Sequence, residues 1–136
     1  MDEGIVGPAP GNRGSAYILD SFRLDASRFT VNAFKNPDPP ELPHHNHRWE
    51  WCWSIILQGG YTHEFFILGE DGKPGPTELK TFRSGDVNFM PWRLYHKIIA
   101  LEPDTYTFLC SGPTRPGHGF EYWHNGRSVP WNEYTP

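Results

Sequence analysis

The chain has 136 residues, of which 12 are Lys or Arg and 16 are Asp or Glu, so its formal net charge at pH 7 is -4. A chain of this length forms one ordinary domain and buries roughly two thirds of its unfolded surface. Because the sequence contains no block of like charge, the composition argues against a nucleic-acid partner and against a membrane-surface helix.

The N-terminal residues lack the pattern of a targeting sequence. Residues 1–14 contain four glycines and two prolines without hydrophobic periodicity, which predicts a flexible tail ahead of a single domain over 15–136. No apolar run approaches the roughly 18 residues of a membrane span. Cys52 and Cys110 have neither CxxC spacing nor the number expected of a disulfide scaffold, so we expect free thiols. Because the sequence shows neither a targeting pattern nor a membrane span, we expect a cytoplasmic protein with no membrane partner.

The apolar residues after position 16 come in short clusters of strand length. The clusters cover 17–19, 29–34, 51–57, 65–68, 87–90, 98–101 and 106–110. A short helix near 20–29 is one alternative, because Leu19, Phe22 and Asp25 have the spacing of one or two helical turns. The rest of the chain shows no sustained helical period.

Turn residues separate these clusters. Residues 36–40 hold three prolines, Asp71-Gly72 is typical of a hairpin, and Asn125-Gly126 is typical of a type I′ turn. Seven or more short strands with turns at regular intervals predict an all-β sandwich or small barrel.

Three histidines are the most informative residues. A single residue, Asn46, separates His45 from His47, and side chains at this spacing on an extended strand point to the same face. His96 begins a later apolar cluster, with Ile98 on its own face and Lys97 on the opposite one. We predict that His45, His47 and His96 bind one divalent metal ion.

The same alternation predicts that His44 and Asn46 face away from the metal. The competing interpretation is that the histidines are surface or capping residues. That interpretation leaves unexplained both the HxH spacing and the frame Gly85-x5-Pro91 ahead of His96.

The spacing resembles the two motifs of the cupin superfamily, whose members are double-stranded β-helix metalloproteins. The family motifs are G-x5-H-x-H-x3-4-E-x6-G and G-x5-P-x-G-x2-H-x3-N. Every interval fits in this sequence, which reads Pro39-x5-His45-x-His47-x4-Cys52-x6-Gly59 and Gly85-x5-Pro91-x-Arg93-x2-His96-x3-Ala100. The resemblance implies an all-β double-stranded β-helix, or jelly-roll barrel, in one domain that includes an aromatic C-terminal segment at 112–136.

Four residues depart from the family pattern, namely Pro39, Cys52, Arg93 and Ala100. Cys52 replaces the glutamate ligand, so three neutral imidazoles would leave the ion with a charge near +2 and with open positions. The favoured interpretation of Cys52 is a small buried hydrophobe. A thiolate ligand at Cys52 and a replacement carboxylate from Glu50 or Glu64 are the alternatives.

Three-histidine cupins to which this pattern is similar include thiol dioxygenases and diketone-cleaving dioxygenases. The resemblance therefore implies a non-haem iron dioxygenase that acts on a small anionic molecule, with Fe(II) favoured over Zn, Mn or Ni. In this interpretation Arg93 binds a substrate carboxylate and Tyr61 orients the substrate. Ser54 and Tyr95 are further candidates for the pocket lining, and Arg48 is expected to face solvent.

Two other function classes stay open. The first is a metal-dependent isomerase, epimerase or lyase that uses His63 or Glu50 as a base. The second is a non-catalytic cupin module that binds a ligand or uses the metal to hold its strands together. If Cys52 points inward, Trp51 and Trp53 point out of the barrel, and we expect a homodimer or the C-terminal aromatic segment to cover them.

Overall fold

The computed structural model describes residues 7–8, 16–24 and 27–136, and none of these residues is helical. The described strands are β1 (Gly7–Pro8), β2 (Ala16–Leu24), β3 (Ser27–Phe34), β4 (Trp51–Gln58), β5 (Gly60–Ile67), β6 (Glu78–Arg83), β7 (Val87–Pro91), β8 (Leu94–Leu101), β9 (Thr105–Ser111), β10 (Glu121–His124) and β11 (Arg127–Pro130). No helix within these ranges is long and apolar enough to cross a membrane.

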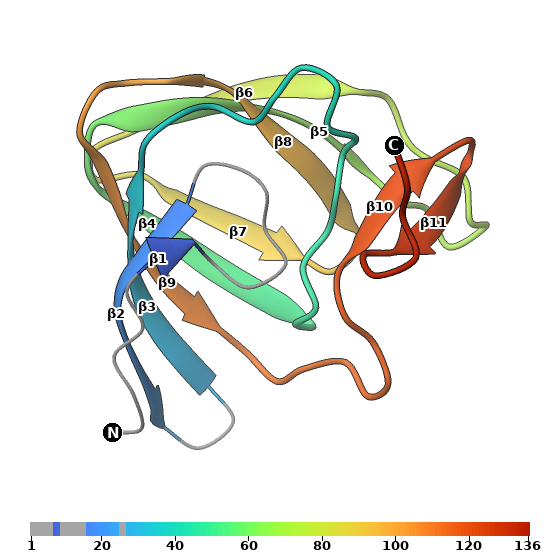
Figure 1. The fold of residues 1–136 in the computed structure, drawn as a ribbon, viewed down its shortest axis with the longest axis horizontal. Coiled ribbons are helices and arrows are strands. Elements are labelled where there is room, and N and C mark those ends of the chain that lie inside the picture. Colours follow the sequence, from blue (N-terminus) through green and yellow to red (C-terminus); the bar gives the residue numbers. More distant parts are fainter. Residues whose placement is uncertain (1–6, 9–15, 25–26) are drawn as a thin grey trace.

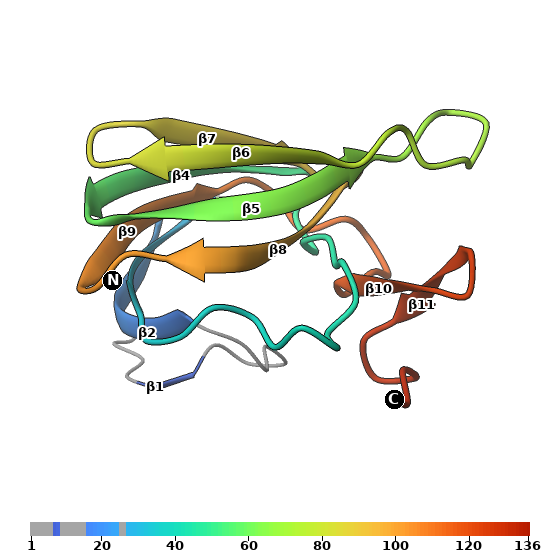
Figure 2. The same cartoon turned by 90° about the horizontal axis from the view of Figure 1, so that it is seen from above.

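Nine of the eleven described strands form two antiparallel sheets that face each other (Figure 1). One sheet has the order β1-β2-β3-β9-β4-β7, and the other has the order β6-β5-β8. The hairpin of β10 and β11 stands at one end of the barrel, as the view from above also shows (Figure 2). This arrangement confirms the predicted all-β jelly-roll class.

The HxH segment joins the smaller sheet to the C-terminal hairpin. The backbone N–H of His45 donates to the carbonyl of His96 at 3.0 Å, and the N–H of His96 donates to the carbonyl of His45 at 2.8 Å. On the other side, the N–H of Trp123 donates to the carbonyl of His44 at 2.8 Å. Residues 44–46 therefore lie between β8 and β10, and this pairing places His45 directly beside His96.

Two buried clusters lie between the sheets. One contains Ile56, Tyr61, Phe82 and Ile98, and the other contains Cys52, Met90 and Leu94. Alternation along each strand sends these side chains inward, and each large apolar side chain contributes roughly 1.5–3 kcal/mol by its burial. Ile98 and Leu94 of these clusters lie on β8, the strand that carries His96.

The short helix considered near 20–29 is wrong for the described part of this region, because β2 runs to Leu24 and β3 starts at Ser27. Phe22 lies opposite Phe29 in the antiparallel register, and the two rings stack with centroids 4.8 Å apart. This cross-strand contact favours the hairpin over a helical turn. Asp25, the third residue of the helical pattern, lies outside the described residues.

Both predicted turns are formed. Asn125 and Gly126 have φ values of 54° and 77° between β10 and β11, as a type I′ turn requires. Gly72, with φ of 80°, lies in the loop between β5 and β6. Of the predicted tail at 1–14, Gly7–Pro8 pairs with β2, and its other residues lie outside the described ones.

Candidate metal centre

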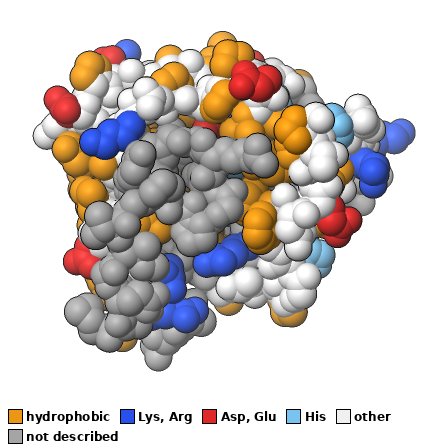
Figure 3. All heavy atoms as spheres, in the orientation of Figure 1, with side chains coloured by type: hydrophobic (Ala, Val, Ile, Leu, Met, Phe, Trp, Pro, Cys, Tyr) orange, Lys and Arg blue, Asp and Glu red, His pale blue; other side chains and the backbone are white. Residues whose placement is uncertain are grey.

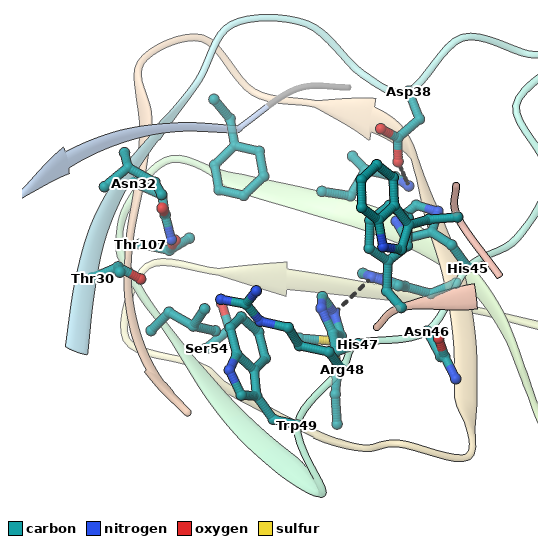
Figure 4. Close-up of a pocket in the computed structure, with 18 of the residues that line it drawn as sticks. Thr30, Asn32, Asp38, His45, Asn46, His47, Arg48, Trp49, Ser54 and Thr107 are labelled. Carbon is teal, nitrogen blue, oxygen red and sulfur yellow. Dashed lines mark hydrogen bonds between the residues drawn. The ribbon is translucent and has the colours of Figure 1, made fainter. Parts of the chain in front are cut away.

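Two of the three predicted metal ligands lie at chelating distance. Nε2 of His47 and Nε2 of His96 are 3.2 Å apart, and the ring centroids are 5.1 Å apart (Figure 4). Nitrogen ligands lie about 2.0–2.1 Å from an ion such as Zn²⁺. Two nitrogen atoms at the observed separation can therefore bind the same ion.

The His45 ring lies beside this pair but does not converge with it. Its centroid is 5.0 Å from that of His96 and 6.5 Å from that of His47. Its Nδ1 lies 3.4 Å from the carbonyl oxygen of Pro43, which favours the tautomer that leaves Nε2 with a lone pair. As the side chains stand, the described residues contain no group of three or more His, Cys, Asp or Glu that holds a metal ion. A three-histidine site requires the His45 ring to turn toward the pair.

Burial keeps these imidazoles neutral. It lowers the pKa of His45 and His96, and it lowers the pKa of His47 to about 3. Neighbouring histidines act in the same direction on His47 and His96. At neutral pH each ring has an unprotonated nitrogen, which is the form that binds a metal. The chemistry of the donor set therefore fits a divalent transition metal.

His63 contacts the Nδ1 side of the His96 ring, and His47 contacts its Nε2 side. The Nδ1 of His63 is 3.1 Å from Nδ1 of His96, and burial followed by Lys80 lowers the pKa of His63 to about 4. If His96 donates its Nδ1 proton to His63, Nε2 of His96 has no proton and faces His47. The alternation of Tyr61, His63 and Phe65 along β5 is the pattern that places His63 inside the barrel.

The predicted alternatives for a fourth protein ligand, Cys52, Glu50 and Glu64, make no contact with His45, His47 or His96 within the described residues. Cys52 is fully buried against Met90 and Leu94, and burial raises the pKa of its thiol to about 12. Glu64 binds His44, with Oε1 2.9 Å from Nε2. Glu50 is exposed. Cys52 thus lies in the environment of a buried hydrophobe, and neither carboxylate replaces the missing ligand.

Asn46 faces away from the histidine pair, as predicted, yet it is buried (Figure 4). Its Nδ2 donates to Oε1 of Glu121 at 3.0 Å, and its Oδ1 accepts from the backbone N–H of Glu121 at 2.6 Å. Arg115 binds the same carboxylate oxygen at 3.2 Å. The outer side of the HxH segment is therefore covered by β10.

A cavity of about 270 Å³ lies next to the histidines and is lined by all three of them. Most of its wall is apolar, from residues such as Phe34, Leu42, Met90, Ile98 and Leu109. A largely apolar cavity with a few polar groups is typical of small-molecule sites.

Tyr61 and Ser54 line this cavity as predicted, and Tyr95 does not. The Tyr61 hydroxyl accepts from Nδ2 of Asn88 at 3.0 Å and donates to Oγ of Ser54 across a long 3.5 Å. Burial raises the pKa of Tyr61, so the hydroxyl keeps its proton at neutral pH. Tyr95 is fully buried on the opposite face of the sheet, stacked on Phe66 with centroids 5.3 Å apart.

Of the two arginines near the motifs, Arg48 lines the cavity and Arg93 does not. Arg93 does not line the cavity, because its Nη1 donates to the carbonyl of Gly69 at 3.1 Å and its guanidinium covers Trp92. Arg48 is exposed as predicted, but it also lines the cavity, with its guanidinium carbon 5.6 Å from the centre of the Trp49 ring. Strand alternation fails at Arg48 because residues 47–48 lie outside any strand.

No protein-family model and no curated protein sequence matches the chain. Solved structures do match. Fe(II)-HppE with the alternative substrate (S)-1-HPP aligns with a TM-score of 0.56 at 10% identity, over 82% of this chain and 56% of that one. Oxalate decarboxylase from Bacillus subtilis aligns with a TM-score of 0.55 at 17% identity, over 92% of this chain and 31% of that one. The chain has the cupin fold.

The chain spans about half the length of HppE and about a third of the length of oxalate decarboxylase. The HppE structure contains Fe(II), and Bacillus subtilis oxalate decarboxylase has Mn(II) centres. At 10% and 17% identity the likeness establishes the barrel and not the reaction.

Proposed function

We propose that this cupin is a metal-dependent enzyme, a non-haem iron dioxygenase that acts on a small anionic organic molecule. His45, His47 and His96 would hold Fe(II). The observation that carries the proposal is the 3.2 Å separation of the His47 and His96 Nε2 atoms at the wall of a cavity of about 270 Å³. Bound iron would supply redox chemistry with oxygen and open positions for the substrate.

The protein groups around this centre have defined tasks. Three neutral imidazoles leave the full charge of a divalent ion uncompensated, which favours an anionic substrate. The apolar wall excludes water from the bound molecule. The proton of the Tyr61 hydroxyl is held only by the 3.5 Å contact with Ser54 and is available to a substrate oxygen.

Lewis-acid chemistry with a redox-inert metal is the second candidate, because a divalent ion with open positions can also polarise a bound substrate. Its predicted bases are poorly placed, because neither His63 nor Glu50 lines the cavity. A purely structural metal is the third candidate. The adjoining cavity argues against it, because a structural site needs no such space.

Oxygen consumption tests the proposal. Protein loaded with Fe(II) under anaerobic conditions is mixed with oxygenated buffer and a panel of small carboxylates, and Zn(II)-loaded protein serves as the control. We expect substrate-dependent oxygen uptake with Fe(II) alone. Turnover of a carboxylate by the Zn(II) form without oxygen uptake would favour the Lewis-acid candidate instead.

A further inference from the structure

One wall of the cavity carries a row of polar side chains from β3. Arg28, Thr30 and Asn32 occupy alternate positions of this strand and all line the cavity. Thr107 of the paired strand β9 also lines it, and the Nδ2 of Asn32 donates to its hydroxyl at 3.4 Å. Alternation along β3 thus places a cation, a hydroxyl and an amide along one side of the same space.

Thr30 is the unusual member of this row. Its side chain is 5% exposed, and its hydroxyl has no hydrogen-bond partner among the described residues. A buried polar group without a hydrogen-bond partner destabilises the folded state. Because the Thr30 side chain lines the cavity, a bound molecule with an acceptor atom would complete its hydrogen bonding.

Two cations lie near Thr30. Arg28 and Arg48 both line the cavity, and in Figure 4 the Arg48 side chain runs alongside Trp49 toward the side where Thr30 lies. Partial burial, followed by the positive charges of Arg28 and Arg23, lowers the pKa of Arg48. The cavity lining also contains Asp38, whose Oδ2 accepts from the backbone N–H of Ile98 at 2.7 Å.

Basic and hydrophobic side chains also lie next to each other on the face of the molecule drawn in Figure 3. This combination suits an amphipathic ligand. A guanidinium group binds a planar carboxylate or a phosphonate through charge-assisted hydrogen bonds, while the apolar wall accepts a ring or a branched chain.

We propose that Arg28, Thr30 and Arg48 form the subsite for the acidic group of the substrate, and that the rest of the substrate is apolar and extends toward the histidines. The substrate class is an organic carboxylate or phosphonate with an aromatic or branched body. This inference rests on the proposed function, because it names the class of molecule presented to the same metal centre.

Binding of three probes tests the subsite. Phenylacetate, phenylphosphonate and the neutral phenylacetamide are titrated into metal-free and Zn(II)-loaded protein, with calorimetry and tryptophan fluorescence as readouts. We expect at least one anion to bind about 10-fold or more tighter than the amide, since a hydrogen bond to a charged group is worth about 1.5–3 kcal/mol. The tighter anion identifies the acidic group.

Thr30→Val separates a binding role from a structural one. Valine has the same shape without the hydroxyl, so anion affinity should fall about 10-fold while the melting temperature rises. Thr62→Val is the matched control, because Thr62 and Thr81 share an exposed 2.7 Å hydrogen bond outside this cavity. The control should leave anion affinity unchanged.

Arg48→Met removes the cation and keeps the length of the side chain, and anion affinity should fall about 10-fold or more. Arg93→Met is the matched control, because Arg93 also stacks on a tryptophan but does not line the cavity. Equal binding of the amide and both anions would overturn the subsite. So would anion affinity that is unchanged in both Thr30→Val and Arg48→Met.

The metal-free titration separates this inference from the proposed function. If the protein proves unable to bind a metal but still binds the anions, and Arg48→Met abolishes that binding, the subsite is supported and the metal-dependent enzyme is overturned. If the protein binds a metal and consumes oxygen, and neither property changes in Arg48→Met or Thr30→Val, the metal-dependent enzyme is supported and the subsite is overturned.

Discussion

The thiol of Cys52 occupies the position of a metal ligand in the motif, but its surroundings are those of a core residue. Cys52→Ser should cost about 1–3 kcal/mol of unfolding free energy, because the new hydroxyl is buried among Met90, Leu94 and other apolar neighbours. Urea denaturation measures this loss, and metal content should stay unchanged. Loss of metal from Cys52→Ala would instead show that the thiolate is a ligand.

The buried histidines predict a specific sensitivity to acid in the metal-free protein. The pKa of His47 is about 3 and that of His63 is about 4, both below the ordinary value of 6.5. The unfolded chain therefore binds protons first as the pH falls below 6.5, and folding loses up to about 1.4 kcal/mol per pH unit for each histidine. Stability is fully present above pH 6.5 and falls toward pH 4.

Urea unfolding at pH 7 and pH 5 measures this effect. We expect a loss of up to roughly 4 kcal/mol from His47 and His63 together, since each contributes about 1.4 kcal/mol per pH unit. His63→Gln should reduce the loss, whereas His118→Ala, at an exposed position, should not. A stability that does not change between pH 7 and pH 5 would show that these rings are not held neutral by burial.

At the scale of elements, the C-terminal hairpin fixes the HxH segment. Trp123 of β10 contacts Phe66 and Tyr95 with ring centroids 5.5 and 5.6 Å away, and its backbone binds His44. Trp123→Ala should therefore cost about 3 kcal/mol of unfolding free energy and also weaken metal binding. Trp53→Ala is the control, because Trp53 is 43% exposed on the outer face of β4.

Chemical denaturation and metal titration of the two tryptophan variants check this prediction. Equal stability losses for Trp123→Ala and Trp53→Ala, with metal affinity unchanged in both, would contradict a supporting role for the hairpin.

Strands with a buried face could be predicted from the sequence, and those without one could not. The cluster at 51–57 corresponds to β4 (Trp51–Gln58), where Cys52, Ser54 and Ile56 are buried at alternate positions. β6 (Glu78–Arg83) was missed because it is an edge strand with only Phe82 buried, so its sequence has no apolar run. Hydrophobic periodicity reports burial, and an exposed edge strand has little of it.

The candidate site also has features that the sequence predicts and features that it does not. The sequence predicts that His45, His47 and His96 lie near one another, and all three line the cavity, but local spacing does not show that the His45 ring turns away from the His47–His96 pair. The place of Arg48 at the cavity and that of Arg93 away from it depend on loop paths that local spacing does not encode. Likewise, the subsite residue Thr30 is 15 residues from His45 in the sequence and meets the cavity only through the packing of β3.

At the scale of the whole molecule, the predicted homodimer remains a prediction. The outer face of β4 and β7 exposes Trp53 (43%), Val87 (46%) and Phe89 (44%), and a second copy of the chain would cover them. Sedimentation velocity should show a dimer that Phe89→Glu converts to a monomer. A monomeric wild-type protein at high concentration would rule out this pairing.

The predicted cytoplasmic location likewise remains a prediction.

Metal stoichiometry tests the central claim most directly. After metal loading and desalting, elemental analysis of the wild-type protein should give about one divalent ion per chain, with a higher melting temperature than the metal-free form. His45→Ala, His47→Ala and His96→Ala should each lose the ion and this stabilisation, and His44→Ala and His118→Ala should retain both. A wild-type protein that binds no metal, or an ion that survives the substitution of His47 and His96, would contradict the account.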